Sequence, residues 1–169
     1  MILGAGNSAG VQRYQALRYG GTQKLIVNAE ICSKSNDELR IITTLHVDGG
    51  CEVAELVLVA GDINSLGLSP TGDTEQCLLA DGGTATFVEY ERVLLTLTSD
   101  DGSVVEASMH PMVIEPSIDS SSSETATPPL PGVSGNIDAQ RILGYGGLTR
   151  LSLKQDFKHQ KLVRVERRA

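Results

Sequence analysis

Thr44-Leu45-His46-Val47-Asp48-Gly49-Gly50-Cys51 is the stretch that decides the fold of this chain. Its β-branched and apolar residues predict a strand, which ends in one acidic residue followed at once by two glycines. Backbone groups hold the carboxylate of an Asp at such a tight turn, and there its pKa can be adjusted for acid/base chemistry. Asp-Gly is also a common turn pair, so the stretch taken alone favours an ordinary β-turn.

The composition predicts one β-rich globular domain. The 169 residues are 40% hydrophobic and 21% charged, which provides enough apolar material for a buried core. Aromatic residues make up only 4% and tryptophan is absent, so the core must consist of Leu, Val, Ile and Ala. The 18 glycines favour many turns. We therefore expect an all-β fold with one short helix.

The net charge and the cysteine content indicate which partners the protein can bind and in which cellular compartment it is found. The net charge of -7 makes the chain a poor ligand for nucleic acid, so we expect no such partner. Cys32, Cys51 and Cys77 are odd in number and lack CxxC spacing, which indicates reduced thiols in an intracellular, cytoplasmic protein. We expect no disulfide framework, no metal and no cofactor. No run of about 18 apolar residues and no secretory apolar segment is present, so neither a membrane span nor a signal peptide is expected.

The hydrophobic pattern divides the chain into three parts. Residues 1–23 predict an irregular N-terminal arm, 24–165 a folded domain, and 166–169 a basic tail. Within the domain, 24–32 and 39–47 predict a hairpin, and 53–59 predicts a short strand. The Ser/Pro-rich segment 117–136 cannot bury enough apolar surface to fold and predicts a disordered insertion.

The remaining segments predict more strands and short helical pieces. Residues 77–80 and 84–98 flank Asp81-Gly82-Gly83, a hairpin-type turn. Residues 104–114 predict a further strand, and 152–165 predict a closing hairpin. We expect a helical turn at 62–68, a loop at 69–73 and the short helix within 137–151.

This order of elements resembles the retroviral-type aspartic proteases, in particular the protease segments of retrotransposon polyproteins. The resemblance covers 24–165 apart from the insertion. It rests on four stretches: 45–51 at the Asp-Thr/Ser-Gly motif of the family, 79–84 at its flap, Ile142-Leu143-Gly144 at its hydrophobic-hydrophobic-Gly element, and 148–157 at its helix and closing strand.

The resemblance implies a retropepsin-like closed β-barrel with one lobe per chain. It implies Asp48 as the catalytic residue, beside an active-site loop of Gly49, Gly50 and Cys51. The implied flap would close over an extended peptide or polyprotein substrate, and an apolar element would support the loop from behind. The flap residues are Ala80, Asp81, Gly82, Gly83 and Thr84, and the support residues are Ile142, Leu143 and Gly144.

Aspartic proteolysis needs two carboxylates that share one proton across a water molecule. The chain offers one Asp-x-Gly of this kind, so the resemblance implies a homodimer. Gly49 stands where the family has Thr or Ser, which removes a hydroxyl that bonds across the dimer axis. Two alternatives stay open: an impaired retropepsin-like module for dimerisation or peptide binding, and a β-rich domain unrelated to proteolysis.

Overall fold

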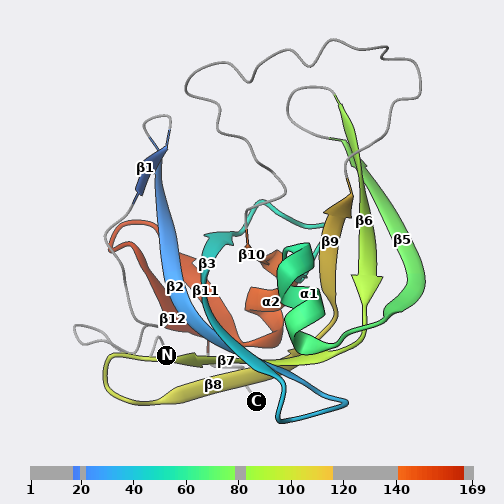
Figure 1. The fold of residues 1–169 in the computed structure, drawn as a ribbon. Coiled ribbons are helices and arrows are strands. Elements are labelled where there is room, and N and C mark those ends of the chain that lie inside the picture. The colour runs from blue at the N-terminus through green and yellow to red at the C-terminus, as the bar shows by residue number, and fades with distance from the viewer. Residues whose placement is uncertain (1–16, 20–21, 79–82, 116–140, 166–169) are drawn as a thin grey trace.

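The computed structural model describes residues 17–19, 22–78, 83–115 and 141–165 (Figure 1). The protein is β-rich, as the composition predicts. Within these residues the elements are β1 (Leu17–Tyr19), β2 (Thr22–Ser33), β3 (Arg40–Asp48), β4 (Leu56–Val57), α1 (Ala60–Leu66), β5 (Pro70–Leu78), β6 (Thr84–Tyr90), β7 (Val93–Thr98), β8 (Val104–Met109), β9 (Pro111–Glu115), β10 (Ile142–Gly144), α2 (Tyr145–Arg150), β11 (Leu153–Asp156) and β12 (Lys161–Arg164). No helix in the described ranges is long and apolar enough to cross a membrane.

One large mixed sheet organises the fold. Its strand order is β5-β6-β9-β4-β10-β3-β2-β7-β8, with β1 paired to β2, while β11 and β12 form a separate two-stranded sheet. β5 and β8 stand at the two ends of this order. The expected closed barrel is therefore not seen in the described part of the chain.

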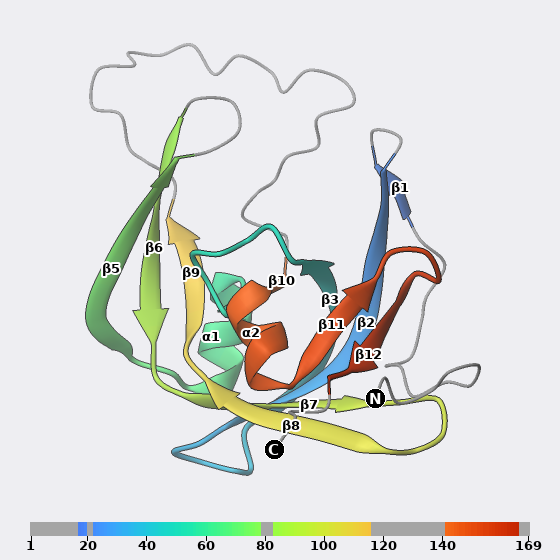
Figure 2. The same ribbon diagram turned by 180° about the vertical axis from the view of Figure 1, so that it is seen from behind.

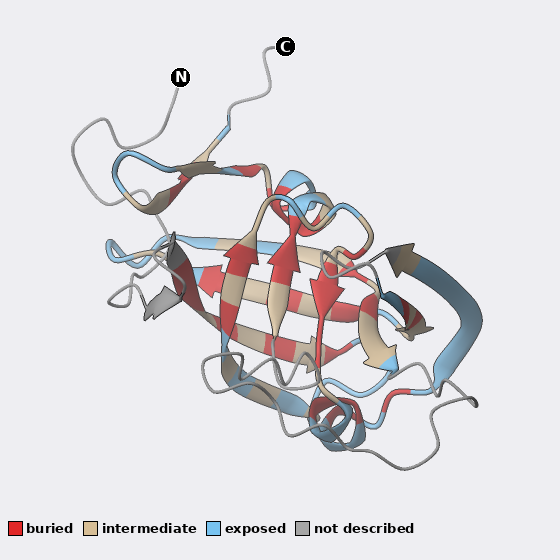
Figure 3. Ribbon diagram, turned by 90° about the horizontal axis from the view of Figure 1, so that it is seen from above, coloured by how far each residue is buried: buried red, intermediate tan, exposed pale blue. Residues whose placement is uncertain are grey.

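The predicted hairpin of the first half is confirmed as β2 and β3. Its antiparallel register runs from Leu25 opposite Val47 to Cys32 opposite Arg40. Alternate residues of a strand point to one face, and on β2 every second residue from Leu25 to Ile31 is buried. Figure 3 shows the buried segments gathered on the central strands. The core is aliphatic, as the scarcity of aromatic residues requires.

The helices differ from the prediction of one short helix, because the described residues contain two. The helical turn expected at 62–68 is the regular helix α1. The helix expected within 137–151 is only α2, because the residues just before it form strand β10. A three-residue strand that inserts between two others is too short to give a periodic sequence signal.

Several predicted strand boundaries were also wrong. Apart from its first residue, the loop expected at 69–73 belongs to β5, whose pairing with β6 shifts register between Pro70 and Thr74. The run 84–98 is divided into β6 and β7, and 104–114 into β8 and β9. The N-terminal arm at 1–23 was expected to be irregular, but part of it is a strand. This strand, β1, pairs antiparallel with the start of β2.

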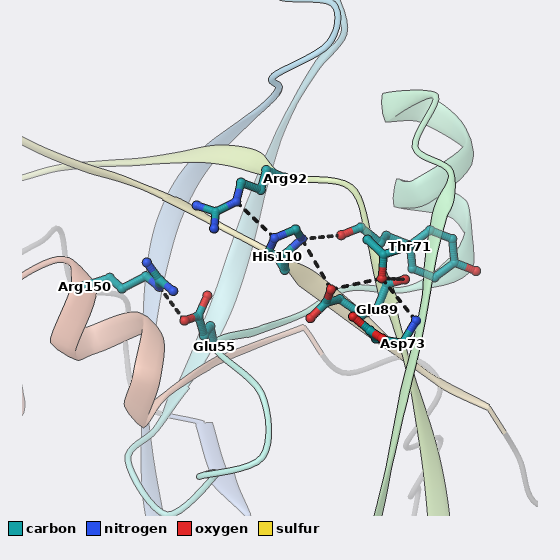
Figure 4. A network of polar contacts seen from close by, with 8 residues as sticks. Glu55, Thr71, Asp73, Glu89, Arg92, His110 and Arg150 are labelled. Atoms are coloured by element: carbon teal, nitrogen blue, oxygen red, sulfur yellow. Dashed lines mark hydrogen bonds and ion pairs between the residues drawn. The ribbon is translucent and has the colours of Figure 1, made fainter.

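The two strand breaks meet at His110 (Figure 4). Arg92 Nε donates to His110 Nε2 at 3.0 Å, so the imidazole proton lies on Nδ1, which is 2.9 Å from the Tyr90 carbonyl oxygen. Thr71 donates to Glu89 Oε1 at 3.0 Å beside this histidine. These polar contacts hold the base of the β5–β6 hairpin against the turn between β8 and β9.

Candidate active site

Strand β3 ends at Asp48, and the backbone of the following turn holds its side chain. The Gly50 amide donates to Asp48 Oδ1 at 3.0 Å, and the Cys51 amide donates to the Asp48 carbonyl oxygen at 3.1 Å. Asp48 is half-buried. A Cβ on Gly50 would lie 3.3 Å from Asp48 Oδ1, whereas a Cβ on Gly49 would meet nothing within 4 Å. The carboxylate is therefore fixed by backbone, with open space at Gly49.

The predicted support element lies directly beside this turn. β10 runs parallel to β3, with Ile142 opposite His46 and Gly144 opposite Asp48. On its other side β10 is antiparallel to β4. The Gly144 amide donates to the Glu55 carbonyl oxygen at 3.0 Å, and the Tyr145 amide donates to the Cys51 carbonyl oxygen at 2.9 Å. Residues about ninety positions apart in the sequence are thus joined behind one carboxylate.

The contact between β10, α2 and the loop after Asp48 is closely packed. A Cβ on Gly144 would lie 2.1 Å from the Ala54 carbonyl oxygen, and one on Gly147 would lie 2.3 Å from the Glu55 carbonyl oxygen. Arg150 of α2 also pairs with the Glu55 carboxylate (Figure 4). Gly144 and Gly147 allow the backbone of β10 and α2 to lie close to the backbone of the loop after Asp48. The ion pair between Arg150 and Glu55 joins α2 to the same loop at the surface.

A second ion pair was missed by sequence reasoning. Asp62 lies in the helical turn expected at 62–68, where an acidic side chain is usually solvated, yet it is buried on α1. Arg141 binds it with two bonds, Nε to Oδ2 at 2.7 Å and Nη2 to Oδ1 at 2.9 Å. The hydrogen bonds that Arg141 donates to the Asp62 carboxylate raise the pKa of the guanidinium. Because the Arg141 carbonyl oxygen accepts from the His46 amide at 2.9 Å, this pair fixes the entry to β10. A separation of 79 residues left no sequence signal for it.

Cys51 is a packing residue of the loop. Burial raises the pKa of its thiol, and the nearby charge of Asp48 adds to the rise. It packs against a small cluster of Ala54, Val57, Ala85 and Phe87, together with Ile142. The thiol is therefore protonated at neutral pH and a poor nucleophile.

The strands of the predicted flap pair as expected. β5 and β6 form an antiparallel hairpin with Leu78 opposite Thr84. Gly83 and Thr84 are exposed, while the predicted tip residues Ala80, Asp81 and Gly82 lie outside the described residues. Ala85 and Phe87 of β6, in the half of the hairpin nearer its turn, pack in the same cluster as Cys51, so this part of the hairpin lies against the Asp48 loop.

Within the described ranges, no group of three or more His, Cys, Asp or Glu residues gathers as a metal site. Comparison with protein-family models, with curated proteins and with solved structures finds no match to this chain. The candidate site consists of one carboxylate on a backbone-held turn, a strand that supports the turn, and a hairpin whose turn-proximal half packs beside it.

Proposed function

We propose that this chain is an aspartic endopeptidase of the retrotransposon or retroviral type, with a retropepsin-like fold. The observation that carries the proposal is the register of β10, which brings Gly144 beside Asp48. An ordinary β-turn would not require a strand such as β10, which is inserted between β3 and β4 beside Asp48. Here the Gly50 amide holds the Asp48 carboxylate, and the tight contact of Gly144 with the Cys51 and Ala54 carbonyl oxygens holds the loop that follows Asp48.

The proposed enzyme is a homodimer, because one chain supplies one such carboxylate. A two-fold axis beside the turn would bring two Asp48 side chains together. One would act as base toward a water molecule, and the other would donate its proton to the peptide carbonyl oxygen. Two close carboxylates raise one of their two apparent pKa values, which favours activity at mildly acid pH. The β5–β6 hairpin would cover an extended peptide and bond to its backbone.

The direct test is cleavage of an unfolded protein at about pH 5, the range in which such a pair holds one proton. We expect cleavage by the wild-type chain and its loss in Asp48→Asn and with a peptidomimetic aspartic-protease inhibitor. Asp100→Asn is the matched control, because Asp100 is an exposed turn residue. Cleavage that survives Asp48→Asn would refute the assignment of Asp48.

A mixing experiment tests the shared site. Asp48→Asn chains added to wild-type chains should form mixed dimers with a single Asp48. At equal amounts and fixed total protein, activity should fall to about a quarter of the wild-type value, because only that share of dimers has two wild-type chains. A fall to half would mean that each chain works alone.

The second candidate function is a catalytically impaired module that dimerises or binds peptide. Gly49 favours it, because the loop lacks the hydroxyl that would bond to a partner loop. Gly49→Thr separates the two candidates, since a side chain at this position has open space. A large gain in cleavage would indicate an impaired enzyme, whereas peptide binding without cleavage in both forms would support the binding module.

A further inference from the structure

His110 is the single residue between β8 and β9, and its imidazole contacts the segment that joins β6 to β7. Arg92 Nε donates to His110 Nε2 at 3.0 Å, and His110 Nδ1 lies 2.9 Å from the Tyr90 carbonyl oxygen. Glu89 Oε1 lies 3.7 Å from the same Nδ1 (Figure 4). The side chains of His110 and Glu89 are only 27% and 20% exposed, so water screens their contact in part.

These contacts require a neutral imidazole. A guanidinium only donates and a carbonyl oxygen only accepts, so Nε2 must be the acceptor and Nδ1 must have the proton. A protonated imidazole has N–H groups on both nitrogens and accepts no hydrogen bond. Protonation of His110 would therefore break the bond from Arg92 and leave two positive charges in contact.

The charged groups around His110 favour different partners for its two forms. Arg92 repels an imidazolium, whereas the Glu89 carboxylate attracts it. Thr71 already donates to Glu89 Oε1 at 3.0 Å, which holds this carboxylate to β5. Two further acidic residues border the network: Glu91, which accepts from the Ser69 amide at 2.9 Å, and Asp73, which is exposed on β5. Protonation therefore moves the favourable contact of His110 from Arg92 to Glu89.

The contacts of His110 lie at the base of the β5–β6 hairpin. β5 and β6 project from β7 and β8, and β6 meets them at its carboxyl end (Figure 2). There the Glu91 amide donates to the Ser69 carbonyl oxygen at 3.0 Å, which connects the end of β6 to the start of β5. Val93, the residue after Arg92, is fully buried in the core. Arg92 therefore lies between a projecting hairpin and a strand that the core holds in place.

The half of the hairpin nearer its turn lies against the Asp48 loop. Ala85 and Phe87 pack in one cluster with Cys51, which belongs to that loop. A change in the bend at Arg92 would therefore move these side chains relative to the Asp48 carboxylate.

We propose that His110 is a pH-dependent latch for the β5–β6 hairpin. The neutral imidazole holds Arg92 and fixes the bend between β6 and β7, whereas protonation releases Arg92 and allows the hairpin to move relative to Asp48. An imidazole changes charge between about pH 5 and 8, so the latch opens as the pH falls through that range. A role for this opening in admitting peptide rests on the proposed function, whose carboxylate pair also favours mildly acid pH.

Amide hydrogen exchange of the full-length chain tests the latch at the Glu91 amide, which bonds to Ser69 across the base of the hairpin. After correction for the intrinsic exchange rate, its protection should fall roughly tenfold between about pH 7.5 and about pH 5, because one hydrogen bond from a charged group is lost. Nitrogen NMR of the neutral His110 ring should find its proton on Nδ1.

Three substitutions separate the latch from other effects of pH. His110→Gln does not titrate, so protection of the Glu91 amide should be the same at both pH values. Arg92→Met removes the donor at an exposed position, so protection should be low at both. His159→Gln, in the exposed turn between β11 and β12, is the matched control and should keep the wild-type response.

Three results would each overturn the latch: equal protection of the Glu91 amide at both pH values in the wild type, a fall that persists in His110→Gln, or a proton on Nε2 of the neutral ring. Proteolysis is separate from this readout, so Asp48→Asn should respond to pH as the wild type does. A chain that shows the response but cleaves nothing would support the latch and refute the proposed enzyme. Cleavage that depends on Asp48 in a chain without the response would overturn only the latch.

Discussion

Replacement of Gly144 by alanine should destabilise the protein through one steric contact behind Asp48. The backbone of Gly144 has φ -86° and ψ 179°, which any residue adopts, so conformational strain plays no part. The added Cβ would lie 2.1 Å from the Ala54 carbonyl oxygen and 2.8 Å from that of Cys51, against an ordinary contact of 3.4 Å or more. Both oxygens belong to backbone, so β10 or the loop at 51–54 must move.

The size of the effect follows from two opposing terms. Overpacking of a tight contact costs up to about 3 kcal/mol, and two backbone oxygens place this contact at the upper end. Alanine also restricts the unfolded chain, which returns roughly 0.4 to 1 kcal/mol. The expected net loss is therefore about 2 kcal/mol, or roughly 4 to 8 °C in Tm for a domain of this size.

Urea denaturation of the purified chain measures this loss, with Gly49→Ala as the matched control. A Cβ at Gly49 meets nothing within 4 Å, so that variant should match the wild type or be slightly more stable. Equal stability of Gly144→Ala and Gly49→Ala would refute the close packing of β10 against the loop. Where Gly144→Ala still folds, the proposed Asp48-dependent cleavage should also fall. The reason is that a shift of β10 displaces the Asp48 turn, with which it is paired.

Three further predictions concern the contacts around the site. Gly147→Ala should destabilise α2 despite the better helix propensity of alanine, because its Cβ meets the Glu55 carbonyl oxygen. Gly146→Ala should be clearly less destabilising, because its Cβ meets the Glu55 Cγ at 3.0 Å and the nearest backbone atom only at 3.7 Å. Arg141→Met leaves the buried Asp62 carboxylate without its charged partner and should cost about 3 kcal/mol in chemical denaturation. The pKa of Asp101 lies at about 2 because two serine side chains donate to it, which NMR titration can measure. Because the pKa of Asp101 is lower in the folded state, its carboxylate stabilises the fold at pH values above the pKa of the unfolded chain. This contribution to the free energy of unfolding is lost as the pH falls toward about 2.

Each of these predictions has a result that would contradict it. Equal effects of Gly146→Ala and Gly147→Ala would show that helix propensity, rather than the backbone contact, decides. An Arg141→Met variant as stable as the wild type would mean that Asp62 finds another partner or takes up a proton. An ordinary pKa for Asp101 would exclude the serine hydrogen bonds in solution.

Local patterns were enough to predict the hairpin of β2 and β3, the closing hairpin of β11 and β12, and the backbone-held turn at Asp48. In each of these, residues close in sequence carry the signal: alternation, turn residues or an Asp followed by glycines. The first part of β5 was missed because its residues from Pro70 to Asp73 are exposed and rich in turn-forming types. The breaks between β6 and β7 and between β8 and β9 were missed because the contacts of His110 join residues about twenty positions apart.

The position of β10 depends on contacts between residues far apart in the sequence. Its residues Ile142-Leu143-Gly144 match the hydrophobic-hydrophobic-Gly motif, but three residues show no periodicity that predicts their place in the sheet. Three residues cannot hold a strand between β3 and β4 by themselves, since ordering them costs roughly 1 to 2 kcal/mol each in backbone entropy. The structure supplies ties on both sides: the Arg141 bond to Asp62 before the strand, and the Arg150 bond to Glu55 after it. One ion pair connects α1, and the other connects the loop between β3 and β4, to the segment that follows residue 140. Substitutions in the Arg141–Asp62 and Arg150–Glu55 pairs should therefore alter the Asp48 turn, although none of these residues belongs to it. They should do so by shifting β10, whose Gly144 lies beside Asp48.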